Sequence, residues 1–317
     1  MQKPSLDAAQ RATLALLQLL QRSGYTFHTV TPLTHARVNA RAGNEIARDL
    51  RDIFGWSRPF AADTLDSGVF HSLRNAGVVV ADGALWRSRI RVAELDGRLF
   101  AHSAYPTTHS DAVFFGPDTY RFIAALQRYL AQREIPIQRA VDIGCGAGPG
   151  AIAIATAAVD ADVYAVDINA AALQLTELNA AAAATHNVSA HHSDLLSAVD
   201  GSFDLAIANP PYLIDPAERA YRHGGGCFGE GLALAIIDAV LPRLAPGGTL
   251  LLYTGAAIVA GGDALLNAAR RRLDAQRAIR WRYEELDPDI FSEELLEGPY
   301  RVADRIAAVA LTCTRTG

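Results

Sequence analysis

The sequence predicts an α/β fold with a doubly wound, mostly parallel sheet, preceded by a small α+β domain. From about residue 140 onward, short apolar runs alternate with helical patterns, and a glycine-rich turn joins the first run to the first helix. Strands separated by helices of this length are typical of parallel sheets with crossover connections. A chain of 317 residues is long enough for two domains, which we place at 1–115 and 116–317.

The first domain reads as helices followed by a hairpin. Helical patterns cover Ser5 to Arg22, Thr34 to Arg51 and Leu65 to Asn75, with breakers between them. Residues 78–103 then alternate apolar and polar side chains around the turn signal Asp96-Gly97, as a hairpin does. Helices followed by one hairpin indicate a winged-helix-like module, which we expect to recognise the substrate.

Charge gives this first domain a mildly basic character. Residues 1–115 hold 13 Lys+Arg and 10 Asp+Glu, a net charge of +3, within a chain whose total is −5. Arg87, Arg89 and Arg91 would share one strand face, either as a basic edge that tracks phosphate or as a solvated face that discourages edge pairing. The negative total disfavours nonspecific nucleic-acid binding by the bulk field.

The second domain supplies the strands and helices of the doubly wound sheet. Strands are expected at 140–143, 162–167, 188–193, 203–208, 248–253 and 306–313. Helices are expected at 151–159, 170–185, 232–244 and 263–273. The acidic segment 283–294 before the last strand is either a lid over the acceptor or a surface loop. Ligands of such sheets bind at the carboxyl ends of the strands.

Cysteine content and the N-terminal pattern indicate the compartment. Cys145, Cys227 and Cys313 lie far apart, so we expect neither a metal site nor a disulfide framework. Polar residues interrupt the leucines of the first 24 residues, which indicates an amphipathic helix rather than a signal peptide or a membrane span. We therefore expect a cytoplasmic protein that does not enter a membrane.

A glycine-rich turn follows the first strand of the sheet. Gly144, Gly146 and Gly148 let the backbone approach a ligand closely, and Cys145 fills a small space between them. Dinucleotide-binding proteins use a similar turn, so the glycines alone do not identify the ligand. Asp142 stands two residues before the first glycine, where a carboxylate suits the cationic amino end of S-adenosylmethionine (SAM) better than a pyrophosphate.

Acids also end the next two strands. Asp167 is placed to accept both ribose hydroxyls, with Ile168 beside it, and Asp194 is placed to accept from the adenine amine, with Leu195 beside it. The alternative for such acids is the capping of the helices that follow. Three acids at successive strand ends favour a bound SAM. In these positions the chain resembles the class I SAM-dependent methyltransferases over residues 117–315, which implies a Rossmann-like fold and SAM as the cofactor.

The strand at 203–208 ends in Asn209-Pro210-Pro211-Tyr212, the most discriminating motif in the chain. An amide or aromatic amine is a weak nucleophile because its lone pair is delocalised. The Asn209 side-chain oxygen and the Pro210 carbonyl can accept its two N–H hydrogens and direct the lone pair to the methyl group. The prolines stiffen the loop, and Tyr212 can stack on a flat acceptor. The motif also favours a cofactor contact at Asn209.

The motif resembles that of the amino-methyltransferases, which include release factor glutamine methyltransferases and enzymes that methylate adenine or guanine amines. Residues 114–120 resemble the Arg-Pro-Glu-Thr-Glu segment of the release factor enzymes, although the Arg and the final Glu are missing. That resemblance implies cofactor contacts for Phe115 and Thr119. Residues 223–232 resemble the glycine-rich segment that follows the motif in those enzymes, with a different charge pattern.

These features leave several functions open. The leading hypothesis is N-methylation of a protein glutamine or other side-chain amide. A nucleic-acid amino-methyltransferase shares every catalytic part, and a small-molecule N-methyltransferase is also compatible with the motif. A noncatalytic module that binds SAM or a nucleotide is disfavoured because the Asn209 to Tyr212 motif is intact. We favour a macromolecular, protein acceptor because the total charge is negative.

Overall fold

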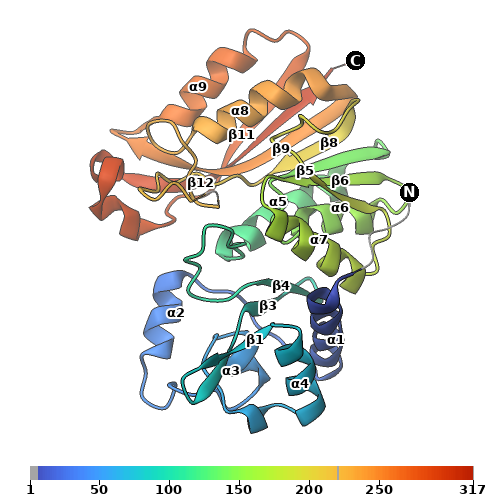
Figure 1. Cartoon of the computed structure of the whole chain (residues 1–317). Helices are drawn as coiled ribbons and strands as arrows, with labels where there is room; N and C mark the ends of the chain where they lie inside the picture. Colours follow the sequence, from blue (N-terminus) through green and yellow to red (C-terminus); the bar gives the residue numbers. More distant parts are fainter. Residues whose placement is uncertain (1–5, 220, 317) are drawn as a thin grey trace. The chain divides into compact units, whose positions relative to one another are not determined.

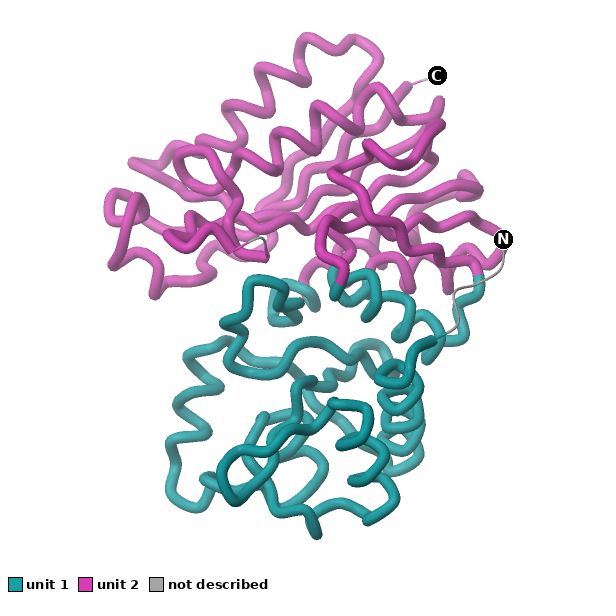
Figure 2. Tube along the Cα trace, in the orientation of Figure 1, with its two compact units in different colours: residues 1–120, 146–149, 171–186 teal, residues 121–145, 150–170, 187–317 magenta. Residues whose placement is uncertain are grey.

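The computed structural model describes residues 6–219 and 221–316 and divides into two compact units. Unit 1 comprises residues 1–120, 146–149 and 171–186, and unit 2 comprises residues 121–145, 150–170 and 187–317 (Figure 2). Each unit therefore draws on separate stretches of the chain. The domain boundary after residue 115 stays a prediction, and each unit is described by itself below.

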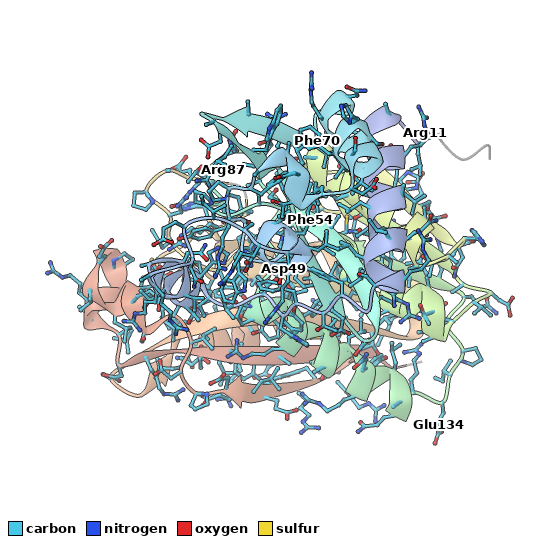
Figure 3. All side chains as sticks on the ribbon, turned by 90° about the horizontal axis from the view of Figure 1, so that it is seen from below. Arg11, Asp49, Phe54, Phe70, Arg87 and Glu134 are labelled. Carbon is cyan, nitrogen blue, oxygen red and sulfur yellow. The ribbon has the colours of Figure 1, made fainter. Side chains whose placement is uncertain are left out.

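The N-terminal part of unit 1 contains four helices. They are α1 (Ala8–Arg22), α2 (Pro32–Asn39), α3 (Leu50–Phe54) and α4 (Ser67–Asn75), with the short 3-10 turn η1 (Ala62–Thr64) before α4. Asp7 and Gln10 form a reciprocal capping box at the start of α1, which satisfies two otherwise unpaired N–H groups. Leu20, Phe54 and Phe70 are buried in the core of this unit, where Figure 3 labels the two phenylalanines. Apolar packing thus joins α1, α3 and α4.

The predicted helix from Thr34 to Arg51 is wrong. Helix α2 ends at Asn39, and the chain then turns through Gly43, whose φ of +83° suits a residue without a Cβ. A separate helix, α3, begins after Asp49, whose side chain caps it by accepting from the Asp52 N–H. The predicted start of the first helix at Ser5 lies outside the described residues.

Unit 1 contains two hairpins where one was predicted. Strand β1 (Val79–Asp82) pairs with β2 (Leu85–Ser88), and β3 (Ile90–Leu95) pairs with β4 (Arg98–Ser103), each as a separate two-stranded antiparallel sheet. The second hairpin turns at Asp96-Gly97, as predicted; the first turns at a different glycine, Gly83. A winged-helix-like arrangement is therefore not confirmed, whereas the α+β character of the N-terminal part is.

The predicted arginine face is also wrong, because the chain changes strand between Ser88 and Ile90. Arg87 lies on β2 and forms an ion pair with Asp82 (Figure 3). Arg91 lies on β3, is only 4% exposed, and donates its Nε–H to the Gly55 carbonyl at 3.0 Å. One of the three side chains is thus inside the unit, and no basic stripe forms.

Unit 2 is built on an eight-stranded sheet in the order β11-β12-β9-β8-β5-β6-β7, with β10 beside β9. Figure 1 labels β5, β6, β8, β9, β11 and β12 of this sheet. Its strands are β5 (Arg139–Ile143), β6 (Asp162–Asp167), β7 (Val188–His192), β8 (Phe203–Ala208), β9 (Leu244–Val259), β10 (Gly262–Asp263), β11 (Ile279–Asp287) and β12 (Arg305–Arg315). Strands β7, β6, β5, β8 and β9 pair in parallel, and β12 runs antiparallel to both of its neighbours. The predicted doubly wound, mostly parallel sheet is confirmed.

Helices and short turns connect these strands. They are α5 (Pro117–Gln132), α6 (Pro149–Ala157), α7 (Ala170–Ala182), α8 (Gly231–Val240), η2 (Leu241–Arg243), α9 (Ala264–Leu273), η3 (Ser292–Leu296) and η4 (Gly298–Val302). Residues 171–186, which hold most of α7, group with unit 1. There the Asn179 side chain bonds to both backbone groups of Ala101 and to the Ala147 carbonyl at 2.8 to 2.9 Å, which fixes α7 to β4.

Strand β11 was not predicted from the sequence. It pairs with β12 from Ile279 opposite Arg315 onward, and it includes the first part of the acidic segment, residues 283–287. Trp281 and Tyr283 pack against the core, while Arg280 and Arg282, which alternate with them, are exposed. Ile279, Trp281 and Tyr283 alternate with Arg280 and Arg282, which is a strand signal that sequence reasoning missed.

The core of unit 2 lies between the sheet and the helices α8 and α9. Ile236, Ile237 and Val240 of α8 are buried with Leu250 and Leu252 of β9. This rigid layer leaves the ends of the parallel strands free to carry loops. Among the described residues, we find no helix that is long and apolar enough to cross a membrane.

Candidate active site

The predicted functional residues of unit 2 follow neighbouring strands. Strand β5 lies between β6 and β8, with Ile143 opposite both Val166 and Ala208 in register. Because these strands are parallel, their carboxyl ends meet at one edge of the sheet. Gly144, Asp167 and Asn209 are the residues at or just beyond these ends, so the structure brings these three sequence positions together at one edge.

The glycine-rich turn is tied to the neighbouring strand. The N–H groups of Gly144 and Cys145 donate to the Val166 carbonyl at 2.8 and 3.1 Å. Gly144 has φ +70°, and no atom lies within 4 Å of the place where a Cβ would stand. The turn therefore has the conformation that needs glycine and a backbone with open space beside it. Cys145 is buried, as expected of a residue that fills a gap.

Four other predicted cofactor residues lie in unit 1. Gly146 and Gly148 have φ +56° and +81°, and a Cβ on Gly148 would lie 3.0 Å from the Thr176 side chain. Close packing against α7 thus requires glycine at that position. Phe115 and Thr119 are both buried in this unit. Their proposed contacts with the cofactor stay predictions.

Asp142 is a helix cap as well as a candidate ligand. It is 2% exposed on β5, and its Oδ2 accepts from the Ala151 N–H at 2.8 Å in the first turn of α6. A Cβ on Gly150 would lie 2.7 Å from that oxygen, so α6 approaches the carboxyl closely. Burial raises the pKa of Asp142 to about 7, and the charge of Asp167 acts in the same direction, while the Ala151 hydrogen bond opposes them.

The other two acids differ in their surroundings. Asp167 is half-buried at the end of β6, and its Oδ1 accepts from the Asn169 N–H at 2.9 Å. Ile168 beside it is 54% exposed, which is unusual for a large apolar side chain next to a buried strand. Asp194 is exposed after β7, and Leu195 has the left-handed φ of +50°. Both readings of Asp167, as a local cap and as a ligand, are compatible with this geometry.

Asn209 follows directly on β8 and is half-buried. No group within residues 6–219 and 221–316 hydrogen-bonds to its side-chain amide. A carboxamide in such a place has both its acceptor and its donors available for a ligand. Pro210 is buried and Pro211 is half-buried, so the loop leaves the strand through two residues of restricted torsion.

Tyr212 is packed into unit 2 rather than displayed on it. Its ring is 7% exposed and lies against β9, where a Cβ on Gly255 would stand 2.3 Å from the ring. Phe291 meets the same ring with 6.0 Å between centroids and an interplanar angle of 65°. The observed role of Tyr212 is to seat the loop, and its stacking on an acceptor stays a prediction.

The residues that follow form a loop with its own ion pairs. We call residues 209–231 the acceptor loop; Ala220 is outside the described residues. Asp215 is buried and binds Arg219 through both carboxylate oxygens, at 2.6 and 2.8 Å. The Arg219 hydrogen bonds hold the pKa of Asp215 well below its usual range. Sequence reasoning missed this pair, although its i,i+4 spacing was a signal for it.

The glycine-rich part of the acceptor loop packs on the motif that precedes it. Gly224 donates to the Leu213 carbonyl at 2.8 Å, and a Cβ on Gly229 would lie 1.9 Å from the Tyr212 carbonyl oxygen. The Glu230 carboxylate accepts from the N–H groups of Cys227 and Phe228 at 3.2 and 2.7 Å. The two motifs singled out in the sequence therefore form one structure.

Comparisons with known proteins identify the family that this chain resembles. The methyltransferase small domain family matches residues 123–257. The release factor glutamine methyltransferase of Bordetella pertussis is 32% identical over 190 residues, which are 56% of this chain and 69% of that protein. The ribosomal RNA small subunit methyltransferase C of Chromohalobacter salexigens is 31% identical over 157 residues, which are 46% of this chain and 42% of that protein.

The likeness has a defined extent. The chain spans 54% to 69% of the length of three release factor glutamine methyltransferases that it matches. A solved transferase structure from Pyrococcus horikoshii aligns with a TM-score of 0.50 and 12% identity, covering 79% of this chain and 82% of that chain, and this supports the fold alone. The chain belongs to the class I SAM-dependent methyltransferases, in the group of the release factor glutamine methyltransferases.

Proposed function

We propose that this protein transfers a methyl group from SAM to a planar amide or amino nitrogen of a macromolecule, with a protein glutamine side chain as the leading acceptor. One observation carries the proposal. The Asn209 carboxamide stands half-buried at the end of β8, with no hydrogen-bond partner in the described chain, and the Pro210 carbonyl follows it. This arrangement suits an acceptor that presents two N–H hydrogens.

The residues of unit 2 fit SAM. The open space beside Gly144 admits a ligand close to the backbone, and the half-buried Asp167 carboxylate can accept from two ribose hydroxyls. The exposed Ile168 side chain offers an apolar surface for the adenine ring. Asp142 can compensate the ammonium charge of the amino acid part. SAM supplies the electrophilic methyl group bound to its sulfonium.

The chain's own residues prepare the acceptor nitrogen. Asn209 Oδ1 and the Pro210 carbonyl oxygen each accept one N–H hydrogen, which holds the nitrogen in line and draws its lone pair out of conjugation. With SAM bound, transfer would form an N–C bond as the S–C bond breaks, and one N–H proton would leave to solvent. No strong base is needed, because the nitrogen becomes acidic only as the new bond forms.

The choice of a protein acceptor rests on charge and on the relatives. The chain carries a net charge of −5, and the release factor enzymes it resembles act on a protein. We assign substrate recognition to residues 1–115 and expect the reaction in the cytoplasm. A nucleic-acid acceptor is the second candidate, favoured by the likeness to a ribosomal RNA methyltransferase. A small molecule is the third.

Transfer of a labelled methyl group from SAM into a cell extract tests this choice. Separate protease and nuclease treatments of the labelled fraction follow. Label that protease alone releases supports a protein acceptor. Label that nuclease alone releases moves the nucleic-acid candidate to first place, and label that stays in the low-molecular-weight fraction throughout contradicts both macromolecular candidates.

A further inference from the structure

A single buried phenol joins distant parts of unit 2. Tyr300 is 2% exposed, and its oxygen accepts from the Ile214 N–H at 2.9 Å. The same oxygen lies 3.1 Å from the Phe228 carbonyl oxygen and 3.4 Å from that of Tyr212. A phenol has one proton to donate, so the shorter contact, to Phe228, is the main one. The hydroxyl thus bonds to both halves of the acceptor loop.

Tyr300 belongs to a segment that is itself fixed to the sheet. We call residues 288–304, between β11 and β12, the brace. The Ile290 N–H donates to the Ile306 carbonyl, and the Asp304 N–H donates to the Ile258 carbonyl, both at 2.7 Å. These bonds attach the two ends of the brace to β12 and β9. The position of the brace is therefore fixed relative to the sheet, and the brace can hold the groups that it contacts in place.

Side-chain contacts also join the brace to the acceptor loop, including one between the rings of Tyr300 and Phe228. Arg222 forms an ion pair with Glu294, and the Phe291 ring lies against the Tyr212 ring. The Tyr300 hydroxyl differs from these side-chain contacts because it bonds to backbone N–H and carbonyl groups of the acceptor loop. Bonds to the backbone restrict the path of the loop directly. Burial raises the pKa of Tyr300 to about 12, so the phenol keeps the proton that it donates.

We propose that Tyr300 is a positioning residue for methyl transfer, whose hydroxyl holds the acceptor loop so that the Asn209 carboxamide and the Pro210 carbonyl face the acceptor nitrogen. This inference rests on the proposed function of that loop. Ile214 precedes and Phe228 follows the turn that contains the Asp215–Arg219 ion pair. Because both residues bond to the same phenol oxygen, the hydroxyl holds the two ends of this part of the loop together. Without that bond, both backbone groups lose a buried partner.

The test compares two tyrosine variants that each remove one phenol oxygen. Tyr300→Phe keeps the ring and deletes the bonds to the acceptor loop. Tyr283→Phe deletes a 2.6 Å bond from β11 to Asp263, a phenol that has no hydrogen bond to the acceptor loop in the described chain. Three measurements follow: hydrogen exchange of the amides in 212–214 and 224–232, SAM binding by calorimetry, and single-turnover methyl transfer to a purified bacterial release factor.

The expected results separate positioning from general stability. In Tyr300→Phe, loop amides exchange about 10-fold faster or more, SAM affinity stays within about twofold, and transfer slows by about 10-fold to 100-fold at saturating acceptor. In Tyr283→Phe, the thermal midpoint falls, while loop exchange and transfer stay within about twofold of the original protein.

Other results count against the inference. Unchanged hydrogen exchange of the loop amides in Tyr300→Phe contradicts the proposed role of the hydroxyl. Equal losses of methyl transfer in Tyr300→Phe and Tyr283→Phe mean that Tyr300 supports the fold without positioning the loop. If the original protein transfers no methyl group to the release factor, the proposed acceptor fails. Exchange and SAM binding then still judge whether Tyr300 positions the loop, because neither measurement needs an acceptor.

Discussion

The two working parts of unit 2 are built in different ways. At the cofactor edge, the functional residues lie near or just beyond the ends of strands, and neighbouring strands and helices hold them. The Val166 carbonyl accepts from the Gly144 N–H, and the Asp142 carboxyl accepts from the Ala151 N–H. The acceptor loop instead depends on Tyr300, which lies 86 positions from Ile214 in the sequence. Changes at one part should therefore spare the other, and the predictions below test that separation.

Asn209→Ala should give the largest effect. Loss of a preorganised polar contact to the acceptor costs about 10²-fold or more in transfer, while SAM affinity stays within about twofold. Asn187→Ala is the matched control. The Asn187 amide donates to the Ala161 carbonyl at 2.9 Å, and this bond is not at the strand ends that carry the site. Single-turnover transfer and calorimetry measure the two quantities. Equal losses in both variants contradict the role of Asn209.

Asp167→Ala should affect the opposite part. Charge-assisted hydrogen bonds contribute about 1.5–3 kcal/mol each, so SAM affinity should fall by about 10-fold to 100-fold. Saturating SAM should restore most of the transfer rate, because the acceptor loop is unchanged. Calorimetry at several SAM concentrations measures the loss of SAM affinity. The transfer rate at saturating SAM measures how much activity is restored. Unchanged SAM affinity removes Asp167 from the site.

Asp142 should make SAM binding depend on pH. Its pKa is raised from 3.8 to about 7, so between these values the folded protein holds a proton that the unfolded chain releases, and folding stability from this group falls as pH rises. A bound ammonium group favours the carboxylate, so SAM affinity should rise by about tenfold as pH rises through 7. Calorimetry between pH 6 and pH 8 measures this change.

Asp142→Asn is the control for that prediction. It keeps an oxygen that can accept from the Ala151 N–H at the start of α6, and it removes the titrating group. The pH dependence of SAM affinity should flatten in this variant. A dependence that persists unchanged assigns the titration to another group.

Asp194→Ala should give the smallest effect. The side chain is exposed after β7, and an exposed hydrogen bond contributes about 0.5–1 kcal/mol, so SAM affinity should fall by about threefold. A fall as large as that of Asp167→Ala means that binding orders the segment after β7. No change at all assigns Asp194 to the surface.

The cofactor edge was predictable from the sequence because its signals are local. The glycine turn and the acids fall at the ends of strands whose apolar runs are short and clear, and β5, β6 and β8 have the predicted positions within a residue or so. The sequence did not show whether each acid caps a local backbone N–H, binds the cofactor, or does both. Asp142 and Asp167 each accept a local backbone N–H, so the capping alternative holds in part.

The role of Tyr300 in the brace had no local sequence signal, whereas strand β11 and the two N-terminal hairpins had signals that sequence reasoning missed. In β11, Trp281 and Tyr283 alternate with exposed arginines, and the acidic residues that follow them up to Asp287 still belong to the strand. Tyr300 carries no local signal, because its partners are brought near only by the sheet. In unit 1, residues 78–103 contain two turn signals, one for each hairpin. The prediction used only the signal at Asp96-Gly97 and therefore gave one hairpin instead of two.

The most direct test of the central claim is to locate the transferred methyl group chemically. Protein labelled from methyl-labelled SAM is hydrolysed in strong acid, which cleaves side-chain amides but leaves N–CH₃ bonds intact. Transfer to a glutamine amide predicts that the label is released as methylamine and that Asn209→Ala lowers its amount by about 10²-fold or more at equal reaction time. Label recovered as a methylated lysine, arginine or histidine, or released as methanol by mild base, contradicts transfer to an amide nitrogen.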